Sequence, residues 1–334
     1  MLVGSGEIIS GLQRPATQIV LLRYHVVLAA RAGSWKRSSW QLDVKFGGTM
    51  NKKTLWFVLL LTLLTVGCKG GRNSSSPVLR LAMIPSTDPG KIVRESQPLV
   101  SYLEKETGSR VELVVPTNYA AVVEAIANDR VDIAYLGGFT FVQASQRAGV
   151  QPLVQRERDQ NFHSVFITQP ALNIKMLEDL KGHTFAFGDV NSTSGHLMPA
   201  YYMRAAGIDP GGLTKTLYTG GHDATALAVA NGKVDAGAMD ELVLASMLKS
   251  AKITDTQVRV FYTTPPFFDY VWAARKGLDP KLRDGFAAAF LKLDASNPQN
   301  KSVLDLLNAT KYVRADDASY DKLRQAARAE GLLK

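Results

Sequence analysis

From residue 78 onward, two kinds of apolar pattern alternate along the chain. Short runs rich in Val, Ile and Leu are typical of buried strands, and longer stretches with apolar residues three or four positions apart are typical of amphipathic helices. The patterns predict a strand, a helix, a strand, a helix and a strand over Val78 to Ile84, Ser96 to Thr107, Val111 to Val115, Tyr119 to Asn128 and Val131 to Leu136. Because such alternation is typical of parallel strand pairing, the sequence predicts an α/β fold with mostly parallel sheets.

The second half of the chain repeats a pattern from the first half. Residues 121–134 and 224–237 share the core Ala-Asn-x-basic-Val-Asp. In each copy we expect a helix to end near the Asn and a short buried strand to follow. The roughly 250 residues that follow position 77 exceed a typical domain, so two similar α/β lobes are the simplest prediction.

Three consecutive hydroxyl residues form the most informative motif of the chain. Ser192, Thr193 and Ser194 stand between a predicted strand over 184–187 and a predicted helix that ends at Gly207. A helix start has unpaired N–H groups and a positive partial charge, so it suits a small oxyanion, to which hydroxyl groups also donate. One hydroxyl is enough to cap a helix. Three in succession therefore predict a binding site for a compact tetrahedral oxyanion without a counter-cation.

Residues 50–67 predict that the protein is exported. They begin with Met-Asn-Lys-Lys, continue with an apolar run and end in a small residue, as secretory signal peptides do. The apolar run is too short to cross a membrane as a helix. Cys68 follows directly and is the only cysteine, so no intramolecular disulfide can form. Residues 68–77 are rich in Gly and Ser, and we expect them to form a flexible tether.

The sequence around Cys68 resembles the lipobox of bacterial lipoproteins, although Thr65 stands where Leu is commonest. The resemblance implies a lipid anchor on Cys68 and a periplasmic or cell-surface location at a membrane. We expect residues 1–49 to be a mis-assigned upstream extension, with the true start at Met50. Residues 1–67 carry six of the nine net positive charges, so the basic balance does not indicate a nucleic-acid partner.

Several motifs in a fixed order make the chain similar to a known family. Besides the hydroxyl motif with Pro199, they are Met83-Ile-Pro85, Tyr119 to Glu124, Val131 to Gly137, Gly221-His222 and Val234-Asp235. The region from Val78 onward resembles the phosphonate-, phosphite- and phosphate-binding subunits of ABC uptake transporters. This resemblance implies a type II-like periplasmic-binding-protein fold, in which two α/β lobes close on a ligand at a hinge.

The resemblance also implies that the chain crosses twice between the lobes. We expect residues 78–167 and 267–334 to form the first lobe and residues 168–266 to form the second. The crossings are expected near Phe166 to Pro170 and Phe261 to Pro266, because both stretches are rich in β-branched residues or proline. We expect the protein to be a monomer that delivers its ligand to an ABC permease in the membrane.

Ligand-binding roles follow from the same resemblance. The expected ligand-binding residues are Ser192, Thr193, Ser194 and His222 as donors, Tyr119 from the first lobe, and Asp269 beside the ligand's protonated edge. Further candidates are Tyr135, Phe162, His163, Asp240 and Glu241. Hydrogen bonds to a charged acceptor contribute roughly 1.5 to 3 kcal/mol each, so four or five donors suffice for tight binding without Arg or Lys.

Two departures from the family pattern bear on the identity of the ligand. Members that bind aminoethyl phosphonates carry a Tyr near Phe162 and an acid about where Leu242 falls. Here Phe162 lacks the hydroxyl, and Asp240 and Glu241 precede Leu242. Because one position along a helix turns a side chain by about 100°, we expect the amine-binding carboxylate to be missing. A smaller, amine-free ligand such as phosphite or a short alkyl phosphonate is therefore favoured.

Three other kinds of function compete with this interpretation. A hydrolase would use Ser194, His222 and Asp269 as a triad, but the chain lacks a Gly-x-Ser-x-Gly elbow. A sensory lipoprotein of the same fold would report its ligand to a membrane kinase, and the sequence does not separate it from a transport subunit. A metal site is not indicated, because the histidines show no close pairing, and no cofactor is expected.

Overall fold

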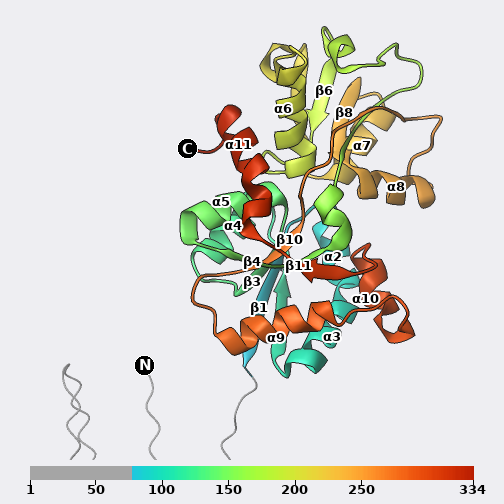
Figure 1. Ribbon diagram of the computed structural model, residues 1–334. Helices are drawn as coiled ribbons and strands as arrows, with labels where there is room; N and C mark the ends of the chain where they lie inside the picture. The colour runs from blue at the N-terminus through green and yellow to red at the C-terminus, as the bar shows by residue number, and fades with distance from the viewer. Residues whose placement is uncertain (1–76) are drawn as a thin grey trace, which may run out of the picture. The chain divides into compact units, whose positions relative to one another are not determined.

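The computed structural model describes residues 77–334 (Figure 1). The expected upstream extension, the signal peptide, Cys68 and all but the last residue of the tether lie outside the described residues. In the described part the chain forms two sheets, and each sheet is packed against helices. None of the helices in this part combines the length and the apolar character that crossing a bilayer requires.

The first lobe is built on a six-stranded sheet with the strand order β11-β4-β10-β3-β1-β2. Its strands are β1 (Val78–Met83), β2 (Arg110–Val114), β3 (Ile133–Leu136), β4 (Gln151–Arg156), β10 (Val271–Ala274) and β11 (Tyr312–Arg314). Its helices are α2 (Pro89–Glu95), α3 (Gln97–Thr107), α4 (Tyr119–Ala127), α5 (Gly138–Ala148), α9 (Pro280–Leu291), α10 (Lys301–Leu306) and α11 (Asp321–Ala329). Helix α3 packs against α9, and α4 packs against α5. The buried Trp272 of β10 contacts Phe286 and Phe290 of α9 and centres the core of this lobe.

The second lobe is built on a five-stranded sheet with the order β7-β6-β8-β5-β9. Its strands are β5 (Ser164–Thr168), β6 (Thr184–Phe187), β7 (Lys215–Tyr218), β8 (Ala236–Asp240) and β9 (Arg259–Thr263). Its helices are the π-helical turn η3 (Thr193–Leu197), α6 (Met198–Ala205), α7 (His222–Ala230) and α8 (Glu241–Lys249). Alternate residues of β5 pack on opposite faces: Val165 and Ile167 lie in the cluster with α7 and α8, and Phe166 lies in the cluster with α6.

The structure confirms the five elements predicted between residues 78 and 136, each to within two residues, as β1, α3, β2, α4 and β3. The sequence repeat is also confirmed, because its first copy forms α4 and β3 and its second copy forms α7 and β8. The predicted strand over 184–187 is β6. The helix predicted after it begins as the wider π-helical turn η3 before it continues as α6.

The prediction of mostly parallel sheets was wrong in one respect, because both sheets are mixed. Strands β1, β2 and β3 pair in parallel, as do β6, β7 and β8, but β10 and β5 pair antiparallel to their neighbours. Strands β5 and β10 are the strands by which the chain enters a lobe after a crossing. The chain enters each sheet at the side where the carboxyl ends of the parallel strands lie. The entering strand therefore has to run in the opposite direction to them.

The crossings lie a few residues away from their predicted positions. Strands β5 and β9 belong entirely to the second sheet, so the chain passes between the lobes at residues 157–163 and 264–270. The β-branched residues that suggested a hinge at Phe166 to Pro170 are core residues of β5 instead. The two crossing segments pair with each other, since Phe162 and Phe267 exchange two backbone hydrogen bonds of 2.9 and 3.0 Å.

Candidate anion-binding site

Several helices of each lobe start at the carboxyl ends of the parallel strands. The parallel strands β2, β3, β6, β7 and β8 all end at the edge from which the chain crosses to the other lobe, and each is followed by the start of a helix. Helices α4 and α5 start there in the first lobe, and η3, α7 and α8 start there in the second. The carboxyl ends of strands in such sheets are the usual place for ligands, and helix starts favour anions.

The two lobes contact each other directly around η3. The backbone N–H of Phe139 in α5 donates a hydrogen bond of 3.0 Å to Thr193 Oγ1. On the same side, Gln143 Nε2 donates to Asn191 Oδ1 at 2.9 Å. A Cβ atom on Gly137 would lie 3.1 Å from Thr193 Oγ1, so the absence of a side chain there lets the lobes approach this closely. The structure is therefore a closed arrangement of the lobes.

The hydroxyl turn, residues 192–197, holds its shape through hydrogen bonds of its own. Ser192 Oγ accepts from the N–H of Gly195 at 2.9 Å, and the Ser192 carbonyl accepts from the N–H of Leu197 at 3.0 Å. A Cβ on Gly195 would lie 2.9 Å from Ser192 Oγ and 3.0 Å from a ring carbon of His222, so glycine is required there. Ser192, Thr193 and Ser194 are at most 2% exposed. The turn thus presents hydroxyl groups and first-turn N–H groups inside the closed protein.

His222 is the first residue of α7 and is prepared to donate a hydrogen bond. Its Nδ1 accepts from the backbone N–H of Asp240 at 3.2 Å, which places the proton of the neutral ring on Nε2. Burial lowers the pKa of His222, and the nearby carboxylates of Asp240, Asp223 and Asp189 oppose that effect only in part. The Nε2 atom is buried and has no hydrogen-bond partner among the described residues. A buried N–H without a partner points to a missing acceptor.

Asp269 lies in the second crossing segment and also has one unused atom. Its Oδ1 accepts from the N–H of Gly138 at the start of α5, at 2.8 Å, whereas its buried Oδ2 has no partner in residues 77–334. The pKa of Asp269 is raised to about 7, mainly by burial; hydrogen bonds from Gly138 and Thr193 oppose this rise, and the charges of Asp159 and Asp240 add to it. Near neutral pH this carboxyl group can therefore either donate or accept one hydrogen bond.

Tyr119, the first residue of α4, supplies a hydroxyl group from the first lobe. It is 1% exposed, and burial together with Asp189, Asp269 and Asp240 raises the pKa of its phenol well above the usual value. The phenol therefore keeps its proton. Asp189 also links the lobes, because its Oδ2 lies 3.4 Å from the Tyr119 backbone nitrogen that donates to it.

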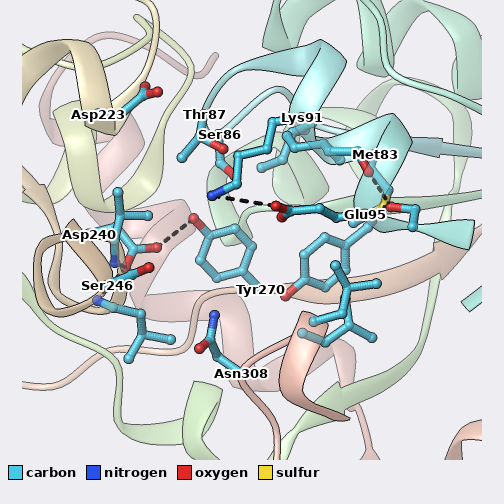
Figure 2. Close-up of a pocket in the computed structure, with 18 of the residues that line it drawn as sticks. Met83, Ser86, Thr87, Lys91, Glu95, Asp223, Asp240, Ser246, Tyr270 and Asn308 are labelled. Atoms are coloured by element: carbon cyan, nitrogen blue, oxygen red, sulfur yellow. Dashed lines mark hydrogen bonds and ion pairs between the residues drawn. The ribbon is translucent and has the colours of Figure 1, made fainter. Parts of the chain in front are cut away.

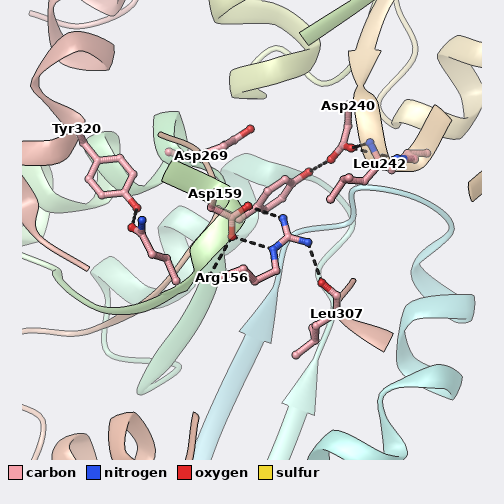
Figure 3. A network of polar contacts seen from close by, with 11 residues as sticks. Arg156, Asp159, Asp240, Leu242, Asp269, Leu307 and Tyr320 are labelled. Atoms are coloured by element: carbon pink, nitrogen blue, oxygen red, sulfur yellow. Dashed lines mark hydrogen bonds and ion pairs between the residues drawn. The ribbon is translucent and has the colours of Figure 1, made fainter. Parts of the chain in front are cut away.

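Of the described residues, no Arg or Lys side chain takes part in the cluster that the hydroxyl turn, Tyr119, His222 and Asp269 form. Among residues 77–334, Arg156 is the one Arg or Lys that is buried, and its guanidinium is engaged by Asp159 Oδ1 at 2.6 Å and by the Leu307 carbonyl at 2.8 Å (Figure 3). The positive partial charge that an anion would meet comes from helix starts and neutral donors instead. The described residues also contain no group of three or more His, Cys, Asp or Glu side chains that could hold a metal ion.

Comparisons with known proteins agree with a site of this kind. Residues 81–320 match the family model described as "ABC transporter, phosphonate, periplasmic substrate-binding protein". The chain is 31% identical over 268 residues to a probable ABC transporter phosphite-binding protein of Prochlorococcus marinus, which covers 76% of this chain and 90% of that protein. The chain belongs to this family.

Other family members are similar over most of their length. The phosphonates-binding periplasmic protein of Escherichia coli is 28% identical over 290 residues, which are 83% of this chain and 85% of that protein. The solved structure of PhnD1 from Prochlorococcus marinus in complex with methylphosphonate has a TM-score of 0.72 at 29% identity, and the match covers 77% of this chain and 99% of that chain. The two-lobed periplasmic-binding-protein fold implied by the sequence is therefore confirmed.

The structure brings the six principal candidates of the sequence analysis together, and Asp240 joins them because its backbone N–H donates to His222 Nδ1. The other four further candidates make their contacts elsewhere. Tyr135 stacks on Tyr270 beside a neighbouring cavity. Phe162 belongs to the paired crossing segments, and His163 Nδ1 lies 2.7 Å from the carbonyl oxygen of Thr264 in the same region. Glu241 lies near His163, and burial raises its pKa.

A cavity of about 280 Å³ lies between the lobes next to the cluster (Figure 2). Residues from both lobes line it, among them Ser86, Tyr135, Asp240, Leu242 and Tyr270. It adjoins the site because the Ser86 carbonyl accepts from the His222 backbone N–H at 3.0 Å. The cavity therefore offers space for a part of a ligand that extends away from the hydroxyl turn.

Sequence reasoning missed four participants. Asp189 and Tyr270 were not singled out, and neither were the N–H groups of Gly138 and Phe139. The glycine pair at 137–138 directly after a predicted strand was a usable signal, because it marks a place where a helix starts and another segment approaches closely. No comparable signal distinguishes Tyr270 or Asp189, since their roles depend on contacts between the lobes.

The raised pKa of Asp269 makes a testable contribution to stability. Because the folded protein holds this proton up to about pH 7 and the unfolded chain releases it near 3.8, the contribution favours folding below pH 4 and is lost as the pH rises to 7. Asp269→Asn mimics the protonated form at every pH. As the pH rises from 4 to 7, the free energy of unfolding of the ligand-free variant should increase relative to that of wild type by up to about 1.4 kcal/mol per pH unit. Urea unfolding at several pH values measures the difference, and a difference that does not change with pH would contradict the assignment.

Proposed function

We propose that this protein is an extracytoplasmic solute-binding protein that captures a small phosphorus oxyanion between its lobes and delivers it to an ABC permease. The main support is two buried atoms next to the hydroxyl turn, His222 Nε2 and Asp269 Oδ2, which have no hydrogen-bond partner within residues 77–334. An oxyanion with one acidic O–H satisfies both, because it accepts from the imidazole N–H and shares its proton with the carboxyl group. Sequence relatives named for phosphite, phosphate and phosphonates support the same ligand class.

The geometry argues against the alternative that the site is a hydrolase. In a Ser-His-Asp triad, the histidine accepts the serine proton on Nε2 while the aspartate accepts from Nδ1. Here Nδ1 of His222 accepts from the Asp240 backbone, so Nε2 already carries the proton. Asp269 Oδ1 is bound to the N–H of Gly138 instead of the imidazole. Ser194, His222 and Asp269 therefore act as donors and an acceptor for a bound anion. We propose that the protein is not an enzyme.

Ser194 provides the cleanest test of the hydroxyl turn. Ser192 Oγ also accepts a hydrogen bond from the Gly195 N–H, so changing Ser192 would disturb the turn. Thr193 Oγ1 accepts one from the Phe139 N–H, so changing Thr193 would disturb the closure of the lobes. Ser194→Ala should weaken binding of methylphosphonate by roughly 1 to 3 kcal/mol, because one donor to a desolvated anion is lost. Calorimetric titration measures the change. The exposed Ser101→Ala on α3 is the matched control, and equal affinities of the two variants would place the ligand elsewhere.

Asp269 should make the protein bind phosphorus oxyanions more tightly than sulfate. Sulfate has no O–H at neutral pH, so above pH 7 it would face an ionised carboxylate with only lone pairs. At about pH 8, wild type should bind methylphosphonate at least about 100-fold more tightly than sulfate, and Asp269→Asn should narrow the ratio by about tenfold because its amide donates to either anion. Thermal shift over a series of concentrations measures both ligands. If sulfate stabilised wild type as well as methylphosphonate does, the role given to Asp269 would be refuted.

We further propose that the protein is a monomer anchored through a lipid on Cys68. The signal-like residues 50–67 and the single cysteine that follows them support the anchor. Cys68→Ser should abolish metabolic labelling with a fatty acid and leave the precursor uncut. Mass spectrometry of the wild-type protein should find a lipid-modified N-terminus at Cys68. An unmodified mature protein that retains residues 50–67 would show that this stretch is not a lipoprotein signal.

A further inference from the structure

One hydrogen bond crosses between the lobes at the boundary of the cavity. The Tyr270 hydroxyl donates to Asp240 Oδ2 at 2.8 Å (Figure 2). Tyr270 directly precedes β10 of the first lobe, and Asp240 ends β8 of the second. Both residues are at most 5% exposed. The bond therefore forms in the closed arrangement, at a place shielded from water.

This bond completes the set of donors to the Asp240 carboxylate. Its Oδ1 accepts from the N–H groups of Leu242 and Val243 at the start of α8, at 2.6 and 3.0 Å. In the part of the chain that the structure describes, the phenol of Tyr270 is the one donor that reaches Oδ2. A buried carboxylate needs such partners, because burying a charge without them is costly. Removing the phenol hydroxyl would leave Oδ2 without a donor, and a cationic group would then be a favourable replacement.

Asp240 is close enough to the anion donors to meet a ligand's substituent. Its backbone N–H donates to Nδ1 of His222, and Nε2 of the same ring is the atom that has no partner among the described residues. Its side chain lines the 280 Å³ cavity together with Leu242 and Tyr270. A short substituent that extends from a phosphorus atom at the hydroxyl turn into this cavity therefore passes Asp240 and Tyr270.

The ring of Tyr270 is held independently of its hydroxyl group. It stacks on Tyr135 with ring centroids 5.3 Å apart and an angle of 13°, and it meets Phe162 edge-on at 5.5 Å. The Arg156 guanidinium lies 5.0 Å from its centroid. Tyr270→Phe should therefore keep the ring in place and remove only the donor to Asp240.

We propose that the Tyr270 hydroxyl is a specificity determinant, which occupies Asp240 and so favours ligands with a neutral substituent over ligands whose substituent carries an ammonium group. This inference rests on the proposed binding of phosphorus oxyanions. With the hydroxyl present, an ammonium group near Asp240 has to displace a satisfied hydrogen bond. Without the hydroxyl, the ammonium group supplies the donor that the carboxylate lacks.

Ethylphosphonate and 2-aminoethylphosphonate differ at the end of the substituent and test the proposal as a pair. Wild type should bind ethylphosphonate more tightly. Tyr270→Phe should shift the ratio of the two dissociation constants toward the amine by about tenfold or more. The ratio is informative because any loss of lobe closure in the variant affects both ligands alike. Calorimetry measures the constants, and an unchanged ratio would overturn the proposal.

Tyr135→Phe is the matched control. It removes a hydroxyl group from the same cavity, and no hydrogen bond joins that hydroxyl to Asp240 among the described residues. The ratio of its dissociation constants for the two phosphonates should equal that of wild type. An equal shift of this ratio in Tyr135→Phe and Tyr270→Phe would overturn the proposal. Adding Asp240→Asn to Tyr270→Phe should abolish the shift, because the attracting charge is gone.

Two outcomes with wild type alone keep the proposals distinguishable. Tighter binding of 2-aminoethylphosphonate than of ethylphosphonate by wild type would overturn the role of Tyr270, even if Tyr270→Phe failed to fold. Failure of folded wild type to bind methylphosphonate, phosphite or either longer ligand would overturn the proposed function itself.

Discussion

Backbone N–H groups that helices leave unpaired at their starts are the physical feature on which the rest of this structure depends. The parallel strands of both sheets end at the edges that face each other, and the following helices begin there. When the lobes close, the starts of α4, α5, η3 and α7 meet around residues 192–194. Their partial positive charge is fixed by the fold and needs no reorientation, so an anion can be held by neutral donors alone.

The protein balances this field with carboxylates of its own. Asp269 accepts from the start of α5, Asp240 accepts from the start of α8, and Asp189 accepts from the start of α4. The start of η3, with its three hydroxyl residues, is left for a ligand. This distribution disfavours highly charged ligands, because several carboxylates lie nearby. It favours a small oxyanion that brings a proton to share with Asp269, whose pKa of about 7 matches that task.

Local patterns in the sequence predicted the elements of the fold and the hydroxyl motif. Strands such as Val78–Met83 are rich in apolar residues, and Ser192 to Ser194 are adjacent in the chain. What the sequence could not predict depends on segments far apart in the chain. The antiparallel entry of β5 and β10, and the positions of the crossings, follow from how two sheets share one chain. The contact of Tyr270 with Asp240 exists only because the lobes close, so neither residue carries a local signal for it.

A crystal structure of the protein with methylphosphonate would test most directly whether an anion is held here without a cation. If neutral donors hold the anion, the phosphonate oxygens should lie at hydrogen-bond distances of about 2.7–3.2 Å from the hydroxyl turn, from His222 Nε2 and from Asp269 Oδ2, with no Lys or Arg in contact. A ligand bound instead beside Lys91 or Arg156 in the neighbouring cavity, or paired with any basic side chain, would contradict it.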